Sequence, residues 1–298
     1  MKGLTLTQQE QTRLQVLNEV MVQRMVIGEA AHVLGVSERH AWRLLAAYRK
    51  EGATALAHGN RGRRPANAIA EAMRARVIML ARTLYAGCNH THFTELLAER
   101  EGLSFARSTV RSILVGAGVS SPRSRRPPRH RTRRERMPQE GVLVQMDGSR
   151  HAWLEDRGPV LTLLLAIDDA TGTPPYGVFR EQEDTAGYFL LFKGIIERHG
   201  IPLGVYTDRH AVFRQTRPVE AGTEREPTQF GRALRELGVT PIFAQSPEAK
   251  GRIERANQTF QDRLRMELRL AGATTLEEAN RVLWDFLPRF SERFGVPA

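Results

Sequence analysis

VLTLLLAIDDATG, at residues 160–172, is a nearly uninterrupted apolar run that ends in turn-forming residues. A run of this length and composition is typical of a central strand that other elements cover on both faces. Its apolar part, residues 160–167, is the longest in the chain and is far shorter than the roughly 20 residues that cross a lipid bilayer. The first ten residues also lack the hydrophobic region of a signal peptide. We therefore expect a soluble, intracellular protein built around a buried strand.

The residues on either side of this run alternate between strand and helix patterns. Two segments precede it: VLVQMD at 142–147, which alternates, and RHAWLE at 150–155, which a short turn separates from the first. The elements expected after the run are helices at about 185–199, 227–237 and 249–270 and short strands at 203–208 and 239–244. The resulting order, βββαβαβα, predicts a mixed sheet with helices packed against its faces, which is an α/β domain at residues 141–298.

Residues 27–50, IGEAAHVLGVSERHAWRLLAAYRK, have the pattern of two tightly crossing helices joined by a turn. Such a crossing needs a glycine in the turn, here Gly35, and an N-cap for the second helix, here Ser37. The small or apolar residues at the contact are Ala30, Ala31, Ala41 and Leu44. The outward face carries Arg39, His40 and Arg43, which would contact DNA in a helix-turn-helix unit at residues 1–66. The alternative is an ordinary helical hairpin with a solvated charged face.

Helices are predicted on both sides of this pattern. The helix before it covers residues 8–25, with Leu14, Leu17, Met21 and Met25 on one face. A second helical unit follows at residues 67–119, with helices at about 69–85 and 92–100 and a third after Gly102. In the third helix the inward residues are Val110, Ile113 and Leu114, and the outward residues expected to contact DNA are Arg107, Thr109 and Arg111.

Cys88 is the only cysteine, which excludes an internal disulfide and indicates a reducing compartment. His90 and His92 lie close to it, but the chain has no second Cys/His pair at the spacing of a zinc finger. We therefore interpret these three residues as the start of a helix and as packing residues.

The positive charge of the chain is concentrated in its first 140 residues. They contain 24 basic and 11 acidic side chains, a net charge of +13, whereas residues 141–298 contain 20 basic and 22 acidic side chains. Residues 120–140 include eight arginines and four prolines, which is typical of an extended linker because this composition cannot form a core. A basic front half joined to a near-neutral rear half indicates that one part of the protein holds a polyanion. We expect the linker to follow a nucleic-acid backbone.

Three acidic residues fall where two strands and a helix of the α/β domain would bring them together. Asp147 ends the first predicted strand, Asp208 ends the fourth, and Glu254 lies one turn into the helix after the fifth. Clustered carboxylates repel one another unless a cation neutralises them. Oxygen ligands without Cys or His favour Mg²⁺ or Mn²⁺, and two such ions about 4 Å apart would support an in-line displacement at phosphorus.

The residues around these acids resemble the signatures of a known family. Residues 145–148 (QMDG), 206–209 (YTDR) and 246–255 (SPEAKGRIER) are similar to three motifs of the retroviral-integrase-like catalytic core of DDE transposases. The chain most resembles insertion-sequence transposases of the ISNCY type, and the resemblance covers nearly its whole length. It implies a multidomain protein, with all-α N-terminal helix-turn-helix units followed by an α/β ribonuclease-H-like domain.

The resemblance also implies an activity. Asp147, Asp208 and Glu254 would be catalytic metal ligands, water would cleave a transposon end, and the freed 3′-OH would attack target DNA. Lys250 and Arg255, which flank Glu254, would hold phosphates. The expected partners are terminal inverted repeats and target DNA, with a homo-oligomer assembled on them in the bacterial cytoplasm and no membrane.

Three neighbouring acidic residues are alternatives to Glu254 as the third metal ligand. Glu248 precedes a glycine turn and is interpreted as a surface residue, and Asp168 and Asp169 fit a strand-ending turn. Relatives often continue into a small C-terminal domain, whereas this sequence stops after a helix that Pro288 is expected to interrupt, so truncation is one interpretation. The rival hypotheses are a DNA-binding regulator with an inactive core and a nuclease that only cuts. The intact acidic trio favours a strand transferase.

Overall fold

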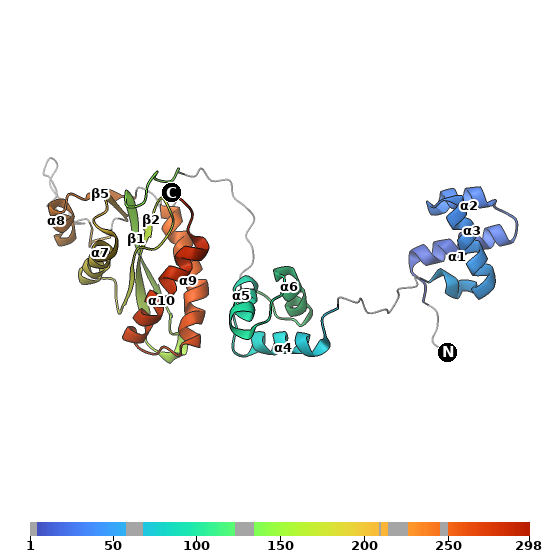
Figure 1. The fold of residues 1–298 in the computed structure, drawn as a ribbon, viewed down its shortest axis with the longest axis horizontal. Coiled ribbons are helices and arrows are strands. Elements are labelled where there is room, and N and C mark those ends of the chain that lie inside the picture. The colour runs from blue at the N-terminus through green and yellow to red at the C-terminus, as the bar shows by residue number, and fades with distance from the viewer. Residues whose placement is uncertain (1–4, 58–67, 123–133, 209, 214–225, 245–249) are drawn as a thin grey trace. The chain divides into compact units, whose positions relative to one another are not determined.

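The computed structural model describes residues 5–57, 68–122, 134–208, 210–213, 226–244 and 250–298. The loop at 58–67, most of the arginine-rich linker and residues 245–249, which include Glu248, lie outside the described residues. The chain divides into two compact units, Met1–Ala70 and Glu71–Ala298 (Figure 1). In the described part, no helix has both the length and the apolar composition to span a lipid bilayer.

The N-terminal unit is a helix-turn-helix arrangement around a small apolar core. Gly35 adopts the left-handed backbone conformation at the turn, with φ 63°, as predicted. Ser37 Oγ accepts a 3.3 Å hydrogen bond from the His40 N–H, which confirms Ser37 as the N-cap. The elements are α1 (Gln8–Met21), α2 (Ile27–Leu34), α3 (Glu38–Glu51) and the short 3-10 helix η1 (Gly52–Leu56), and the fully buried core residues are Leu17, Leu45 and Leu56.

Two details of this unit differ from the prediction. Helix α1 ends at Met21, whose side chain is exposed, because Gln23 adopts a positive φ of 59° that the helix cannot continue through. Residue 25 therefore lies outside the helix. On α3, Leu45 is buried more fully than Leu44, because it lies one helical turn after the buried Ala41.

Three further helices open the second unit. They are α4 (Glu71–Arg82), α5 (His90–Glu101) and α6 (Arg107–Gly116). Asn89 caps α5 by accepting hydrogen bonds from the N–H groups of Thr91 and His92, and Gly102 ends it with φ 66°. The inward face of α6 is buried as predicted, at Val110, Ile113 and Leu114. Cys88, His90 and His92 are buried around the start of α5, where the packing interpretation puts them.

The sheet of the second unit is mixed, as predicted. Its order is β3-β2-β1-β4-β5, with β1, β2 and β3 antiparallel and with β4 and β5 parallel to β1. The strands are β1 (Leu143–His151), β2 (Leu161–Asp168), β3 (Gly177–Arg180), β4 (Gly204–Thr207) and β5 (Thr240–Phe243). This arrangement is the ribonuclease-H-like core that the resemblance implies. The prediction of fold class is confirmed.

One predicted strand is wrong. Residues 142–147 and 150–155 are not two strands, because β1 runs through Gly148, and the short 3-10 helix η2 (Glu155–Arg157) follows. Trp153 and Leu154 are both fully buried, so these apolar residues serve core packing at a turn and do not form a separate strand. The strand that completes the antiparallel set is β3, which has only four residues and shows no strand periodicity in the sequence.

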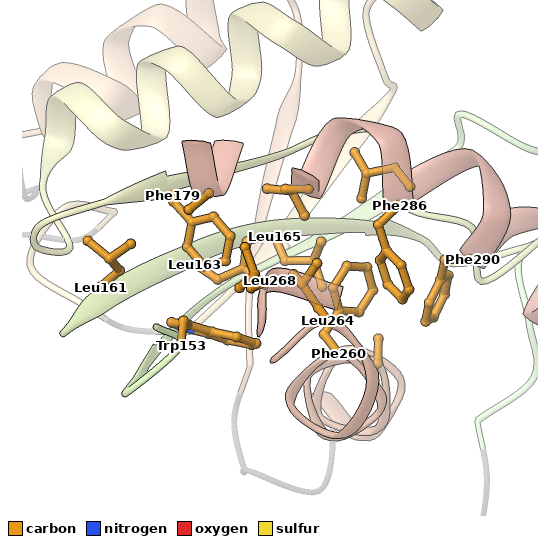
Figure 2. Close-up of a cluster of buried hydrophobic side chains, with 14 of the residues drawn as sticks. Trp153, Leu161, Leu163, Leu165, Phe179, Phe260, Leu264, Leu268, Phe286 and Phe290 are labelled. Atoms are coloured by element: carbon orange, nitrogen blue, oxygen red, sulfur yellow. The ribbon is translucent and has the colours of Figure 1, made fainter. Parts of the chain in front are cut away.

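Strand β2 is buried along its whole length, as its apolar composition predicts. Leu163 and Leu165 face one apolar cluster, which contains Phe260 and Leu264 of α9 and Phe286 of α10 (Figure 2). Alternate residues of β2 face a second cluster on the other side of the sheet, built with α7 and α8. The helices are α7 (Thr185–His199), α8 (Gln229–Glu236), α9 (Gly251–Leu270) and α10 (Leu276–Phe294).

Helix α10 continues through Pro288, contrary to the prediction that this residue interrupts it. Proline removes one intrahelical hydrogen bond and strains the preceding turn. Pro288 is exposed, while Leu283, Phe286 and Phe290 on the opposite face are buried against the sheet. The apolar contacts on both sides of Pro288 therefore hold the helix together.

Ion pairs join α5 to the two C-terminal helices. Arg263 on α9 makes a two-pronged ion pair with Glu95 on α5. The Glu267 side chain on α9 is 6% exposed and accepts hydrogen bonds from Arg100 at 2.8 Å and from Arg289 at 3.2 Å. Breaking a buried ion pair is strongly destabilising, because it leaves an uncompensated charge. These contacts hold α5 against the sheet domain within the second compact unit.

The charge of Glu267 makes stability depend on pH. Burial acts to raise the pKa of Glu267, but the nearby His92 and two arginines outweigh it and lower that pKa to about 2. The stabilisation is therefore present above the ordinary pKa of 4.5 and is lost as the pH falls toward 2. We expect Glu267→Gln to be less stable than the wild type by about 3 kcal/mol at pH 7, with the difference vanishing near pH 2.

Urea unfolding of both proteins between pH 7 and pH 2 measures this difference. Glu277→Gln, at an exposed position of α10, is the matched control. A constant gap between the wild type and Glu267→Gln across this range would contradict the prediction.

Candidate active site

Asp147 and Asp208 are brought together by the parallel pairing of β1 and β4. In that pairing Gln145 lies opposite Tyr206, and each aspartate is two residues further along its chain. Asp147 lies within β1, not at its end, and Asp208 directly follows β4. The two carboxylates are therefore neighbours at the same edge of the two strands.

The ammonium group of Lys250 lies between these aspartates. Its Nζ is 2.7 Å from Asp147 Oδ1 and 4.0 Å from Asp208 Oδ2. Lys250 is the N-cap residue of α9 and is only 6% exposed. The sequence predicts that Lys250 holds a phosphate, whereas in the structure its charge compensates the two aspartates.

Glu254, the third predicted ligand, is not gathered with the two aspartates. Among the described residues, no group of three or more His, Cys, Asp or Glu side chains is arranged to hold a metal ion. Glu254 is half-buried in the first turn of α9, on the same face as Lys250 and Asn257. Asn257 Nδ2 donates a 2.8 Å hydrogen bond to Asp147 Oδ2. The contacts of Lys250 and Asn257 thus direct this face of α9 toward Asp147.

Glu183 and Tyr188 also border the site, and neither is among the residues predicted from the sequence. The Tyr188 hydroxyl donates a 2.6 Å hydrogen bond to Glu183 Oε1. A Cβ added to Gly148 would lie 2.5 Å from Glu183 Oε2, so this carboxylate fills the space beside Asp147 that a side chain would take. The available signal was the glycine of the QMDG motif, because a glycine inside a strand marks the close approach of another group.

The electrostatics of the site leave an excess of negative charge. Burial raises the pKa of the Asp147 carboxyl; Lys250 opposes this rise, while the charges of Asp208 and Glu183 add to it. Burial also raises the pKa of Tyr188, and the charge of Glu183 raises it further. A group whose charged form is disfavoured in this way gains from an additional cation nearby.

The residues predicted to contact DNA lie on the outward faces of their helices. On α3, Arg39 and Arg43 are exposed and His40 is half-buried, with its Nε2 3.5 Å from Arg43 Nη2. The corresponding residues of α6 are Arg107 and Arg111, which are exposed, and Thr109, which is half-buried. Arg255 is exposed on α9. Both helices therefore present basic side chains to the solvent, and their role on DNA remains a prediction.

Comparisons of the sequence agree with this organisation. Residues 21–75 match the winged helix-turn-helix family. The chain is 40% identical over 292 residues to the putative transposase y4bF of Sinorhizobium fredii (strain NBRC 101917 / NGR234), which covers 98% of this chain. It is 37% identical over 298 residues to the transposase for insertion sequence IS1202 of Streptococcus pneumoniae, which covers 88% of this chain. The chain spans 63% of the length of each of these relatives.

Solved structures similar to this chain include retroviral integrase cores. The HTLV-2 integrase catalytic core domain in complex with magnesium, in its trimeric form, has a TM-score of 0.39 and 18% identity, over 50% of this chain and 86% of that one. The catalytic core domain of BIV integrase has a TM-score of 0.35 and 19% identity, over 48% of this chain and 80% of that one.

The fold and the sequence comparisons define a helix-turn-helix protein with a ribonuclease-H-like domain. Within that class, the chain is similar over most of its length to a putative transposase and to the transposase of an insertion sequence. The predicted resemblance to transposases is therefore confirmed.

Gly148 is expected to tolerate a side chain only if Glu183 moves. In Gly148→Ala the new methyl group displaces the Glu183 carboxylate and breaks its bond to the Tyr188 hydroxyl. We expect this substitution to lower the free energy of unfolding by about 1–3 kcal/mol, because a buried hydroxyl loses a charged partner. Glu183→Ala should have a similar cost.

The double variant Gly148→Ala/Glu183→Ala is the control for this contact. Its cost should be close to that of Glu183→Ala alone, since the methyl group then enters vacated space. Urea unfolding of the three variants measures the coupling, and two costs that simply add would show that Gly148 and Glu183 do not interact.

Proposed function

We propose that this chain is a DNA transposase, which cleaves DNA at the ends of a mobile element and joins the freed 3′ ends to target DNA. The observation that carries the proposal is the pairing of Asp147 with Asp208 at neighbouring strand positions, with α9 held against Asp147. Similarity to transposases over nearly the whole chain supports the same activity.

The donor set of this site fits Mg²⁺ or Mn²⁺, and we propose two ions. Asp147, Asp208 and Glu254 offer only carboxylate oxygens, which hard divalent cations prefer. The excess negative charge around Asp147 supports cation binding. The buried Oδ1 of Asn257 is a further oxygen that has no hydrogen-bond partner in the described part of the chain. The chemistry that bound ions supply here is activation of the attacking oxygen and stabilisation of the leaving 3′ oxygen.

The proposed reaction consists of two in-line displacements at phosphorus. In the first, a water oxygen bonds to phosphorus and the P–O3′ bond at the element end breaks, which leaves a free 3′-OH. In the second, that 3′ oxygen bonds to a target phosphorus as a target P–O3′ bond breaks. One phosphodiester replaces another in the joining step, so no external energy source or covalent protein intermediate is required. The exposed Arg255, next to Glu254, would hold a DNA phosphate during these steps.

In this proposal the helical segments and the arginine-rich linker hold the DNA. The terminal inverted repeats are the sequence that α3 would read, through Arg39, His40 and Arg43. The outward face of α6 and the linker arginines would bind phosphates, since basic side chains gain affinity by releasing the counterions of DNA. The resulting assembly is proposed to be a homo-oligomer that holds both element ends and the target.

Replacing Glu254 tests the chemistry separately from DNA binding. We expect Glu254→Gln to lower Mg²⁺-dependent cleavage and joining by about 1,000-fold or more, since losing a metal ligand removes several kcal/mol of transition-state stabilisation. The substrate is a duplex that carries the inverted repeats flanking the coding region. Binding of the same duplex in a gel-shift titration should stay nearly unchanged.

Glu248→Gln is the matched acidic control and should retain activity. Wild-type-like activity in Glu254→Gln would overturn the assignment of this residue. A wild-type protein that binds the duplex but never cuts it would instead favour the rival hypothesis, a DNA-binding regulator with an inactive core.

Replacing Arg39 and Arg43 tests whether α3 recognises the inverted repeats. We expect the variant with both residues changed to Ala to bind the repeat duplex more weakly, with the slope of log K against log salt reduced by about 2. Changing Arg13 and Arg24 to Ala removes the same charge from other positions of this unit and should leave the slope nearly unchanged. Gel-shift titrations across salt concentrations measure the affinity and the slope for both variants. Equal slopes in the two variants would exclude α3 as the helix that binds the repeats.

A further inference from the structure

Asp169 is a fully buried carboxylate that collects donors from three parts of the chain. Its Oδ1 accepts hydrogen bonds from Gln145 Nε2 at 2.7 Å and from Arg252 Nη1 at 2.8 Å. The guanidinium of Arg134 also pairs with Oδ1, and Oδ2 accepts the Met137 N–H at 3.0 Å. These donors belong to β1, to α9 and to the C-terminal end of the arginine-rich linker. One carboxylate therefore ties all three together.

Gln145 extends this connection to the helix that carries Glu254. It is fully buried in β1, two residues before Asp147, and its Oε1 accepts the Ile253 N–H at 3.3 Å. Helix α9 has no side-chain hydrogen bond from its own N-cap residue, so an N–H group of its first turn needs an acceptor from elsewhere. Gln145 supplies that acceptor from β1, while Asp169 fixes its amide nitrogen.

Arg252 makes the second link between Asp169 and α9. Its Nη1 donates to Asp169, and its Nη2 donates to the carbonyl oxygen of Arg134 at 2.6 Å. Arg252 and Ile253 are the two residues directly before Glu254, and both are held by hydrogen bonds that lead to Asp169. The placement of this turn relative to β1 therefore depends on one buried charge.

We propose that Asp169 is a positioning residue for the candidate active site, and that it acts through Gln145 and Arg252 to fix the first turn of α9 against β1. The proposal deepens the proposed function, because what Asp169 positions is Glu254 relative to Asp147. Hydrogen-bond partners behind a metal ligand commonly set its orientation, and their loss typically costs about 10- to 100-fold in metal affinity or activity. The C-terminal end of the linker is held at the same place, since Arg134 and the Met137 N–H bind the same carboxylate.

Asp168 is the matched control for Asp169. It is the adjacent residue and is also a buried carboxylate, 2% exposed. Its partners are the backbone N–H and hydroxyl of Thr171, both at 2.9 Å, and the Gly141 N–H at 2.9 Å. The bonds to Thr171 form the strand-ending turn that the sequence predicts, the bond from Gly141 ties this turn to the chain just before β1, and none of these three bonds involves α9. Replacing Asp168 therefore also removes a buried, hydrogen-bonded carboxylate and lowers stability, but it leaves the contacts of α9 in place.

The experiment compares Asp169→Asn with Asp168→Asn in the full chain by three measurements. These are the thermal unfolding midpoint, Mn²⁺ binding by calorimetry, and hydrogen exchange of the amides in residues 251–254. We expect both variants to lose stability. Only Asp169→Asn should weaken Mn²⁺ binding, by about 10- to 100-fold, and speed up exchange at the start of α9.

Gln145→Met keeps a side chain of similar length but removes both the Ile253 acceptor and the bond to Asp169. It should reproduce the weaker Mn²⁺ binding and the faster exchange, and it decides the proposal if Asp169→Asn does not fold. Equal Mn²⁺ affinity and equal exchange in the two aspartate variants would overturn the positioning role. A wild-type protein that neither binds Mn²⁺ nor cleaves the repeat duplex would overturn the proposed function instead, and the exchange data would still decide whether Asp169 holds α9.

Discussion

The parallel register of β1 and β4 is the constraint on which the candidate site depends. Side chains alternate between the two faces of a strand, so a slip of one residue would turn Asp147 away from Asp208. The register is held by apolar burial, since Val144 and Met146 of β1 share a buried cluster with Val205 of β4. The acidic side chains are therefore placed by a core that contains none of them, and α9 is held on the sheet by apolar packing and at Asp147 by polar contacts.

Features with a local cause could be predicted from the sequence. Ser37 caps α3 and Gly35 turns the chain because capping and left-handed backbone depend on residues within a few positions. The burial of β2 on both faces follows from its composition, and α7 occupies the residues 185–199 that periodicity indicates. The neighbouring positions of Asp147 and Asp208 also follow from strand order, because the first and fourth predicted strands, which carry these residues, pair with each other in the sheet.

Features decided by distant contacts could not be predicted. The apolar residues around Trp153 suggest a second strand after a turn, but the Trp153 indole packs edge-on against Phe179 of β3 and fills the core instead. Pro288 stays within α10 because the tertiary contacts of the helix outweigh the missing hydrogen bond. The direction of a long side chain is also invisible in a sequence, so the ion pair between Lys250 and Asp147, 103 residues apart, had no local signal.

Lys250 gives the aspartates a counter-ion that is part of the polypeptide. A tethered ammonium cannot diffuse away, so its effective concentration at the carboxylates is fixed by the fold and does not change with the ionic composition of the medium. Any divalent cation that enters must compete with Lys250 for the aspartates. The apparent affinity of the cation therefore reflects the free-energy difference between aspartates paired with Lys250 and aspartates bound to the cation. The core can consequently fold with its acids partly compensated, and ion occupancy becomes an exchange between partners that is separate from folding.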